Sequence, residues 1–186
     1  MRGDGTRRGW LTVALDPELH DRAAFSSGVD AVDNFLRRTA NKLSRADNLR
    51  TFVLAAEDGA VIGYYSLNAS EIDYAELPAK YARTRPRHGM IPASFIAMIG
   101  VDQAYQGRGV GTALLVDCIA RIADAADLMG IALVLLDVLD DGDQAALARR
   151  TRLYEEFGFR SLARDPTRLY LPLASVRASI ERQRYH

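Results

Sequence analysis

Several residue types and patterns are scarce in this chain of 186 residues, and each scarcity excludes a class of protein. A single cysteine, Cys118, cannot form a disulfide framework or a thiolate metal cluster. His20, His88 and His186 stand far apart and form no ligand pair, so we expect no metal site. No apolar run approaches the roughly 18 residues of a membrane span. These features predict a cytoplasmic protein without a membrane anchor.

An excess of charge is also absent, because 24 basic and 24 acidic residues cancel. The chain as a whole is therefore not a polyanion binder, although its charges are unevenly spread. Its length suits one domain, and a hydrophobic content of 48% is enough to bury a core. We expect a flexible basic leader over residues 1–9, a single domain over residues 10–173 and a polar tail over residues 174–186.

The most informative stretch is a glycine-rich turn between an apolar strand and an amphipathic helix. Residues 94–101 are almost all apolar, as in an interior strand, and apolar residues recur at helical spacing over residues 110–129. Between them, Gly107, Gly109 and Gly111 remove side chains in front of the first helical N–H groups, where the helix dipole is positive. The turn therefore predicts a phosphate or pyrophosphate site that needs no metal.

The rest of the chain alternates strands with helices. Strands are expected over residues 10–15, 51–57, 60–67, 130–138 and 168–173. Further helices are expected over residues 29–43, 75–82 and 144–157, and the tail is expected to be a loose helix. Asp58-Gly59 predicts a hairpin turn between the second and third strands. Two apolar strands joined by the long helix form a parallel crossover, which indicates an α/β (α+β) fold.

The glycine-rich turn matches neither of two common phosphate motifs. It lacks the Lys-Ser/Thr pair of the Walker loop, and its spacing, Gly107-x-Gly109-x-Gly111, is not that of the dinucleotide fingerprint. Gln106-x-x-Gly109-x-Gly111 does resemble the acyl-CoA loop of the GCN5-related N-acetyltransferase (GNAT) superfamily. A second likeness is the helix that carries Tyr154 and closes with Phe157-Gly158-Phe159. The resemblance covers about residues 10–173.

The resemblance implies a mixed central sheet with splayed parallel strands, flanked by helices, and an acetyl-CoA site. The superfamily often forms homodimers. Tyr154 matches the family's general acid, because a phenol with a pKa near 10 is protonated at neutral pH. No general base can be named. The cofactor-binding residues that the resemblance implies are Ile99, Gly100, Val101, Gln106, Gly107, Arg108, Gly109, Val110, Gly111 and Thr112.

A narrower resemblance is to the toxin acetyltransferases of bacterial type II toxin–antitoxin systems. It rests on residues 51–53, 63–65, 77–79, 101–109 and 165–173. It implies acetylation of the α-amine of aminoacyl-tRNA, which blocks translation, and a small ribbon-helix-helix antitoxin as partner. This chain departs from the family at Met98, where members usually have Arg, and in its long 141–150 segment; both concern the substrate.

Rows of cationic side chains are candidates for contact with tRNA phosphates. They are Arg37, Arg38, Lys42 and Arg45 on the first helix, Arg83, Arg85 and Arg87 in a loop, and Arg149, Arg150 and Arg152 on a later helix. An ordinary solvated face is the alternative for each row. Two other functions stay open: an acetyltransferase acting on a protein N-terminus, a lysine or a small amine, and a non-catalytic acyl-CoA-binding protein on the same fold.

Overall fold

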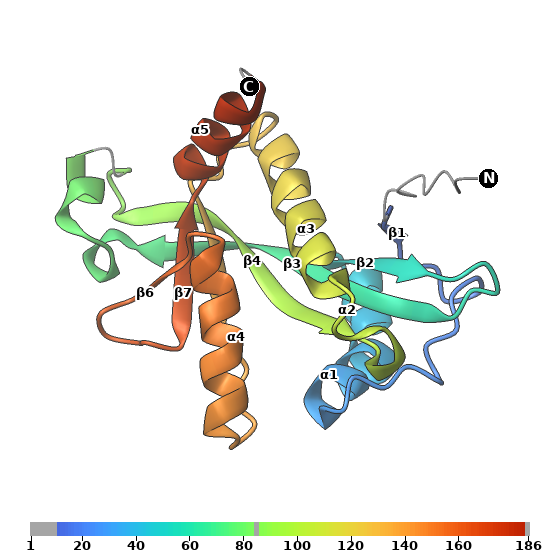
Figure 1. The fold of residues 1–186 in the computed structure, drawn as a ribbon. Coiled ribbons are helices and arrows are strands. Elements are labelled where there is room, and N and C mark those ends of the chain that lie inside the picture. Colours follow the sequence, from blue (N-terminus) through green and yellow to red (C-terminus); the bar gives the residue numbers. More distant parts are fainter. Residues whose placement is uncertain (1–10, 84–85, 185–186) are drawn as a thin grey trace.

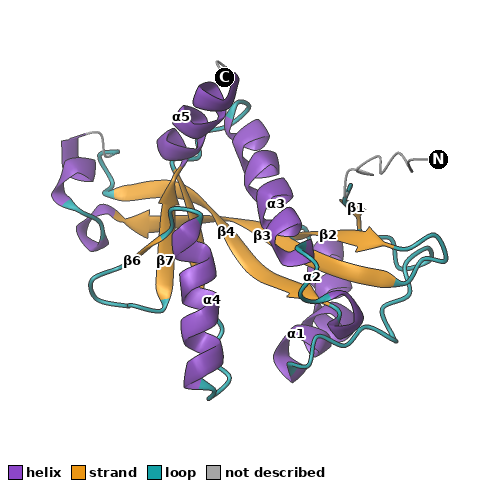
Figure 2. Ribbon diagram, in the orientation of Figure 1, coloured by secondary structure: helices purple, strands orange, loops and turns teal. Residues whose placement is uncertain are grey.

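In a computed structural model that describes residues 11–83 and 86–184, the chain forms one mixed sheet flanked by helices (Figures 1 and 2). The seven strands follow the order β1-β2-β3-β4-β5-β7-β6, with β4 and β5 parallel and the other neighbours antiparallel. The strands are β1 (Val13–Ala14), β2 (Arg50–Ala55), β3 (Val61–Asp73), β4 (Met90–Val101), β5 (Leu133–Asp137), β6 (Arg160–Ser161) and β7 (Arg168–Pro172). The helices are α1 (Asp30–Asn34), α2 (Ala40–Arg45), α3 (Val110–Ala126), α4 (Gln144–Glu156) and α5 (Leu173–Arg184).

This architecture confirms the expected α/β (α+β) class, because α3 connects the parallel strands β4 and β5. The hairpin is also confirmed, with Gly59 at a φ of +86° in the turn between β2 and β3. Element ends differ from the expectation. β1 has only two residues, and β3 runs on to Asp73, into a stretch expected to be irregular. Short 3₁₀ turns over 74–76 and 79–83 replace the expected 75–82 helix.

The first helical segment runs from Asp30 to Arg45 and includes one irregular turn. A π-helical stretch, Phe35–Thr39, joins α1 to α2. Val32, Leu36 and Ala40 are buried on one side, at the spacing that puts residues on a common helical face. Val32 and Leu36 belong to a cluster that includes Tyr64 of β3. The expected amphipathic helix is therefore confirmed, and it ends two residues later than position 43.

The two faces of the sheet are covered by different elements (Figure 2). The first face carries α3, and residues of α4 and α5 pack into the same cluster through Tyr154 and Val176. The second face carries α1–α2 over β2, β3 and the end of β4. Farther along this face, Tyr81 of the 79–83 turn packs with Tyr170 of β7. The second face is therefore covered at both ends by separate segments.

A polar network joins the start of the described chain to α3. Thr12 and Tyr65 both donate hydrogen bonds to Asp117, at 2.6 and 2.5 Å. The Nε of Arg121 donates to the Tyr65 hydroxyl at 2.9 Å, and its guanidinium lies 3.9 Å from the ring centroid of Phe52. Burial is the largest cause of the raised pKa of Tyr65, followed by its bond to Asp117. The network positions the first strand against the sheet, and nothing in the local sequence pattern predicts it.

Candidate active site

The parallel strands β4 and β5 are paired along only part of their length. Their register runs from Ala93 opposite Leu133 to Ile96 opposite Leu136, where the ladder ends. β4 then continues to Val101 with β3 as its partner. We call residues 93–96 and 133–136 the closed half of this strand pair, and residues 97–101 and 137–139 the open half. The expected splayed pair is therefore present.

A bulge in β4 marks the point where the two strands separate. Ser66 of β3 pairs with Met98 and Leu67 pairs with Ile96, so Ala97 has no opposite residue. A bulge of this kind bends its strand and increases the local twist. Because it also shifts the alternation by one residue, Ile96 and Ile99 both pack on the face that carries α3.

The open half leaves backbone groups of β4 facing away from β3. The Asp102 N–H donates to the Ile62 carbonyl of β3 at 2.9 Å. Because successive residues of a strand turn their backbone groups to opposite edges, Val101 and Ile99 face the other edge, where β5 has departed. The Gln106 side chain donates to the Val101 carbonyl at 2.9 Å. The amides of Ile99 and Val101 are thus placed to pair with an extended ligand.

The glycine-rich turn presents a row of backbone donors. The N–H groups of residues 107–112 donate to no acceptor among the described residues, and the first helical bond of α3 joins the Ala113 N–H to the Gly109 carbonyl. Gly107 and Gly109 have φ values of +72° and +80°, and a Cβ at either would meet nothing within 4 Å. The space in front of these donors is therefore open. This is the geometry that favours an anion at a helix N-terminus.

A segment far away in sequence holds this turn in place. The Ser26 N–H donates to the Asp102 carboxylate at 2.9 Å, and the Gln103 N–H donates back to the Ser26 carbonyl at 2.8 Å. Gln106 Nε2 donates to the Ser27 carbonyl at 2.9 Å. Gly28 lets the segment approach, since a Cβ there would lie 2.5 Å from Gln103 Nε2. These hydrogen bonds of Gln106 brace the loop, and its expected contact with the cofactor stays a prediction.

The other expected cofactor residues lie in or next to the same turn, and the two remaining glycines differ in why they have no side chain. Gly100 needs to be glycine for packing, because a Cβ there would lie 2.4 Å from Cγ1 of Val32 in α1. A Cβ at Gly111 would meet Val101 at an ordinary 3.7 Å. The exposed Arg108 lies over the Tyr105 ring, 5.7 Å from its centroid. These residues are brought together by the turn between β4 and α3.

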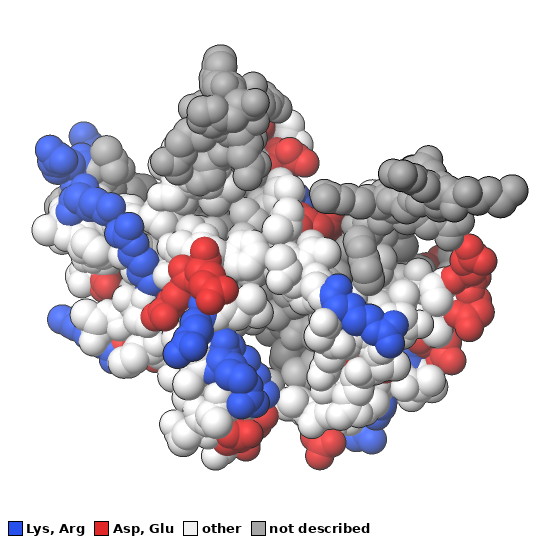
Figure 3. Space-filling model, in the orientation of Figure 1, with Lys and Arg blue, Asp and Glu red and all other residues white. Residues whose placement is uncertain are grey.

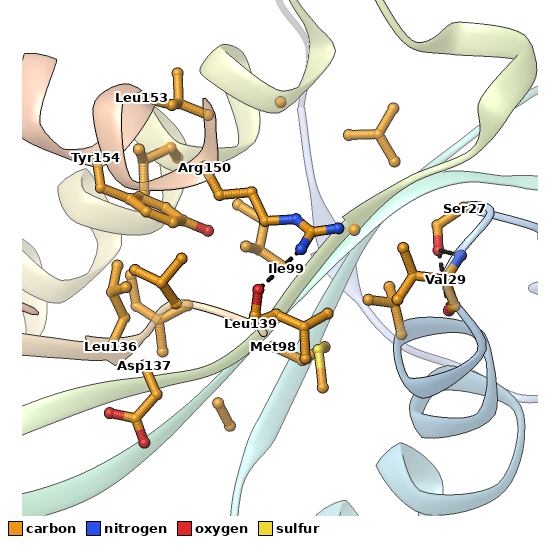
Figure 4. Close-up of a pocket in the computed structure, with 18 of the residues that line it drawn as sticks. Ser27, Val29, Met98, Ile99, Leu136, Asp137, Leu139, Arg150, Leu153 and Tyr154 are labelled. Carbon is orange, nitrogen blue, oxygen red and sulfur yellow. Dashed lines mark hydrogen bonds between the residues drawn. The ribbon is translucent and has the colours of Figure 1, made fainter. Parts of the chain in front are cut away.

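A cavity of about 630 Å³ occupies the open half (Figure 4). Leu115 and Tyr154 line it from the face that carries α3, and Val29 and Met98 line it from the face that carries α1. It therefore passes between the separated strands and reaches both faces of the sheet. Gly111 and Gln106 also line it, so the cavity is continuous with the glycine-rich turn.

Tyr154 lies on the last turn of α4, with its side chain directed into this cavity (Figure 4). Its ring packs edge-on against Phe159, with centroids 5.9 Å apart. Burial, with a smaller contribution from Cys118, raises the pKa of Tyr154 to about 12, and the positive charge of Arg150 opposes this rise. The hydroxyl is therefore protonated at neutral pH and can donate a proton. Its position supports the role expected from sequence.

Arg150, at the end of the 141–150 segment, lines the cavity beside Tyr154. Asp143 caps α4 by accepting from the N–H groups of Ala145 and Ala146, at 2.9 and 3.0 Å. Arg150 reaches back from α4 into the loop and donates to the Leu139 carbonyl at 2.8 Å. It was expected on a cationic outer row, but it lies in the cavity wall instead, because its guanidinium is also bound by Asp141.

The candidate phosphate contacts on the first helix are not equivalent. Arg37 donates a hydrogen bond to the Phe25 carbonyl and lies 4.0 Å from Asp33, so it holds the segment before α1. Contact of Arg37 with a substrate stays a prediction, since both of these contacts use its Nη2 and the residue is exposed. Arg38, Lys42 and Arg45 are exposed.

The candidate contacts in the 83–87 loop lie at the opposite end of β4. Arg83 and Arg87 are exposed, and Arg85 lies outside the described residues. This loop precedes Met90, whereas the glycine-rich turn follows Val101, so β4 separates them by roughly 36 Å at about 3.3 Å per residue. Figure 1 shows the two loops at opposite ends of the strand. Figure 3 shows basic side chains gathered over α4 and over the end that carries the loop. Sequence alone did not reveal this separation.

Two other classes of site are not found in the described part of the chain. No group of three or more His, Cys, Asp and Glu side chains within residues 11–83 and 86–184 could hold a metal ion. Over the same residues, no helix combines the length and apolarity needed to cross a bilayer.

The sequence of this chain is similar to those of known proteins. A family model described as "Acetyltransferase (GNAT) family" matches residues 17–159. The chain belongs to the GNAT family. It is similar to a probable toxin TacT of Sinorhizobium fredii (strain NGR234), with 55% identity over 165 residues, 88% of this chain and 91% of that protein. It is also similar to a tRNA-acetylating toxin of Mycobacterium tuberculosis, with 33% identity over 163 residues, 88% and 92% of the two chains.

Solved structures with the same fold include two of the toxin AtaT. AtaT complexed with acetyl-methionyl-tRNAfMet has a TM-score of 0.80 and 22% identity, over 91% of this GNAT chain and 98% of that chain. A tyrosine-to-phenylalanine variant of AtaT, bound to the C-terminus of the antitoxin AtaR and to acetyl-CoA, has a TM-score of 0.74 and 20% identity, over 91% and 97%. At this level of identity the likeness establishes the fold.

Some residues of the site belong to recognisable sequence motifs, and others do not. The GNAT loop and the helix with Tyr154 were recognisable as short local patterns. Ser27, Val29 and Leu139 line the cavity from loops and helix starts that carry no motif. Arg150 stood in a row of arginines, and only the position of Asp141 nine residues earlier hinted at a bond between them.

Proposed function

We propose that this chain is an acetyl-CoA-dependent N-acetyltransferase that modifies the α-amine of aminoacyl-tRNA and thereby blocks translation as a toxin. The similarity to a probable toxin TacT and to a tRNA-acetylating toxin supports this assignment, because both alignments span 88% of the chain. The observation that carries it is the open half of β4 and β5. There, unpaired backbone donors and the Tyr154 hydroxyl meet in a single cavity.

The residues of the open half fit acetyl-CoA in three respects. The free N–H groups of residues 107–112 suit the pyrophosphate, which is doubly charged and prefers a helix N-terminus. The edge of β4 at Ile99 and Val101 suits the amide groups of the pantetheine arm. A cavity of about 630 Å³ that reaches both faces leaves room for the acetyl donor on one side and an acceptor on the other. No metal is needed for any of these contacts.

The chemistry then follows from the groups around the cavity. A neutral amine attacks the thioester carbonyl, and a backbone N–H on the open edge of β4 stabilises the oxyanion that forms. Collapse breaks the carbon–sulfur bond, and the leaving thiolate needs a proton. Tyr154 is the residue that supplies it, since its hydroxyl is protonated at neutral pH and points into the cavity. The α-amine of an aminoacyl ester is largely neutral near physiological pH, so no dedicated base is required.

The exposed cationic residues would bind the tRNA backbone. Arg38, Lys42 and Arg45 lie on the helical segment next to the cavity, and Arg83 and Arg87 lie at the far end of β4. Contacts of this kind release counterions, so the affinity for tRNA should fall steeply as salt rises. Arg37 belongs to the same proposal, although its Nη2 also donates to the Phe25 carbonyl and lies 4.0 Å from Asp33.

The partners follow from the same proposal. The structure of AtaT with the C-terminus of the antitoxin AtaR supports a small antitoxin as partner. A ribbon-helix-helix fold for that antitoxin and a homodimeric state of this chain are predictions from the family resemblance. An enzyme that acts on charged tRNA works in the cytoplasm, where charged tRNA is found. Size-exclusion chromatography with light scattering would measure the oligomeric state of the chain alone and with the neighbouring gene product.

The test of the proposal is acetyl transfer from labelled acetyl-CoA to three sets of acceptors. These are bulk charged tRNA, the same tRNA after deacylation, and a panel of peptides and small amines. Label on charged tRNA alone is the expected result. Label on peptides or small amines alone would overturn the tRNA assignment and leave the acetyltransferase intact. Cofactor binding without label on any acceptor would favour a non-catalytic acyl-CoA-binding protein.

A further inference from the structure

Arg150 lies one helical turn before Tyr154 on α4 and lines the same cavity. Side chains four residues apart on a helix are neighbours on one face. Figure 4 shows the side chains of Arg150 and Tyr154 entering the same cavity, with the guanidinium of Arg150 reaching the Leu139 carbonyl. Of the residues that line this cavity, Arg150 is the single basic one. Its charge is therefore in a position to act on the phenol.

The position of that charge is fixed by a set of hydrogen bonds that we call the Arg150 fork. Nη1 donates to the Leu139 carbonyl at 2.8 Å and to Asp141 Oδ1 at 3.1 Å, and Nη2 donates to Asp141 Oδ2 at 2.8 Å. Arg150 holds the pKa of the Asp141 carboxyl at about 2, so this partner stays ionised at physiological pH. Such two-point contacts orient a planar guanidinium in a way that a single contact does not.

The fork leaves part of the guanidinium available to the cavity. Three of its five N–H groups are used, and the Nε–H and one Nη2–H donate to no acceptor within residues 11–83 and 86–184. A structural ion pair alone would not need to face a cavity. The Arg150–Asp141 pair is also only about a quarter exposed, at 26% and 27%, so solvent screens it less than a pair on the outer surface.

The surroundings of Tyr154 make a nearby cation useful. Phe159 packs against its ring, Cys118 on α3 lies close by, and Asp137 and Asp140 line the cavity from the end of β5. Burial and Cys118 favour the neutral phenol and so raise the pKa of Tyr154. Arg150 is the one group in this set that stabilises the phenolate. Without it, Tyr154 would be a weaker acid.

We propose that Arg150 is a positioning residue for acetyl transfer: the fork fixes its charge beside Tyr154, where it stabilises the phenolate left after proton donation. The inference rests on the acetyl transfer proposed above and not on the identity of the acceptor. When the carbon–sulfur bond breaks, the phenol proton passes to the leaving thiolate, which gives free thiol. The nitrogen of the new amide then loses its extra proton, which returns the phenolate to the phenol. No oxidant or other reactant is required.

The direct test measures the phenol without any substrate. Site-specific Tyr154→3-nitrotyrosine gives a phenol whose ionisation is followed by visible absorbance. Adding Arg150→Gln should raise the pKa of this phenol by about one unit, because a cation that favours the phenolate is gone. Arg150→Lys should restore part of the difference. Arg177→Gln, which breaks an exposed pair with Asp127 of 2.7 Å, is the matched control and should leave the pKa unchanged.

Asp141→Asn separates fixing the charge from supplying it. The variant keeps the positive charge of Arg150 and loses the ionised half of the fork. We expect the pKa of the nitrophenol to shift by less than in Arg150→Gln. An unchanged pKa in both the Arg150→Gln and the Asp141→Asn proteins would overturn the proposal and leave the fork as a purely structural contact between the loop and α4.

Kinetics on the unmodified tyrosine provide the second readout. With saturating acetyl-CoA and whichever acceptor is active, Arg150→Gln should lower kcat about tenfold with little change in KM, and Arg150→Lys should recover part of kcat. A rise in KM with kcat retained would contradict the proposal, because it would assign Arg150 to binding. If the enzyme is active on charged tRNA but Arg150→Gln leaves the pKa of the nitrophenol unchanged, this inference alone is refuted. If Arg150→Gln raises the pKa of the nitrophenol but the protein is inactive on charged tRNA, only the proposed acceptor is refuted.

Discussion

The two halves of the β4–β5 pair are built from similar apolar residues, but one half forms packed core and the other lines a cavity. In the closed half, β4 and β5 satisfy each other's backbone groups, and side chains such as Leu133 and Leu135 are almost fully buried. In the open half, Ile99 and Val101 pair with β3 on one edge but have no strand on the edge that β5 has left, and a cavity lies there. The separation of β4 from β5 over a few residues therefore replaces packed core with a cavity.

The comparison shows where to look for function in this fold. Buried backbone groups are nearly always paired, so a strand edge left unpaired inside a protein calls for a partner from outside. The bulge at Ala97 creates that edge, and the segment of residues 25–29 holds the neighbouring loop open. A catalytic side chain can then reach the cavity from a neighbouring element, as Tyr154 does from α4.

The largest effect is expected from removing one oxygen in the open half. Tyr154→Phe should lower kcat about 100-fold or more, because general acids typically contribute 10² to 10⁴. The affinity for acetyl-CoA should be retained, since the phenol hydroxyl is placed for chemistry. Steady-state kinetics and calorimetric titration measure the two quantities. Tyr170→Phe makes the same change beside the closed half, and equal losses in both variants would break the comparison.

Removing a core side chain in the closed half should affect stability more than chemistry. Leu135→Ala should lower the free energy of unfolding by about 2–5 kcal/mol, the usual cost of such a cavity. Leu153→Ala, at a half-buried position lining the open half, should cost less stability and raise KM. Urea denaturation measures the first effect and initial rates measure the second. Identical stability losses would show that the open half is as tightly packed as the closed half.

A smaller effect is expected from one methyl group in the glycine-rich turn. Gly109→Ala should weaken acetyl-CoA binding about tenfold, since a left-handed conformation costs an L-residue about 1–2 kcal/mol. Gly130→Ala is the control, because Gly130 needs no positive φ, its Cβ would meet nothing within 4 Å and it does not line the cavity. Calorimetric titration with acetyl-CoA distinguishes the two. A normal affinity in Gly109→Ala would remove the loop from the cofactor site.

The smallest effect is a pH dependence of stability. Because the pKa of Tyr154 is raised from 10.0 to about 12, its neutral form stabilises the fold fully below pH 10, and this contribution is lost as pH rises toward 12. Between pH 10 and 11 the free energy of unfolding of the wild type should fall by roughly 1 kcal/mol more than that of Tyr154→Phe. Urea melts at the two pH values measure the difference. Parallel pH dependences would place Tyr154 in water rather than in the cavity.

The sequence predicts the parts of this site that are continuous in the chain. The strand, glycine-rich turn and long helix lie within residues 94–129, and each has a local cause in periodicity or in glycine. Tyr154 follows from a short motif at a helix end. The α/β (α+β) class follows from two apolar strands on either side of one helix.

The parts that depend on distant contacts had no such signal. The bulge at Ala97 is a shift in the register between β3 and β4, and the sequence of a single strand does not predict it. From sequence, Arg37 cannot be distinguished from its solvated neighbours, whereas in the structure it donates to the Phe25 carbonyl. Arg150 likewise changes from a surface charge to a cavity residue only when the loop with Asp141 folds back. These positions are set by tertiary packing, which overrides local pattern.

Hydrogen exchange of backbone amides with and without acetyl-CoA tests the central claim most directly. The account predicts that the amides of Ile99 and Val101 and those of residues 107–112 become protected when acetyl-CoA binds, because the ligand pairs with groups that the chain leaves free. The amides of residues 93–96 in the closed half should not change. Protection elsewhere, with the open half unaffected, would contradict the account.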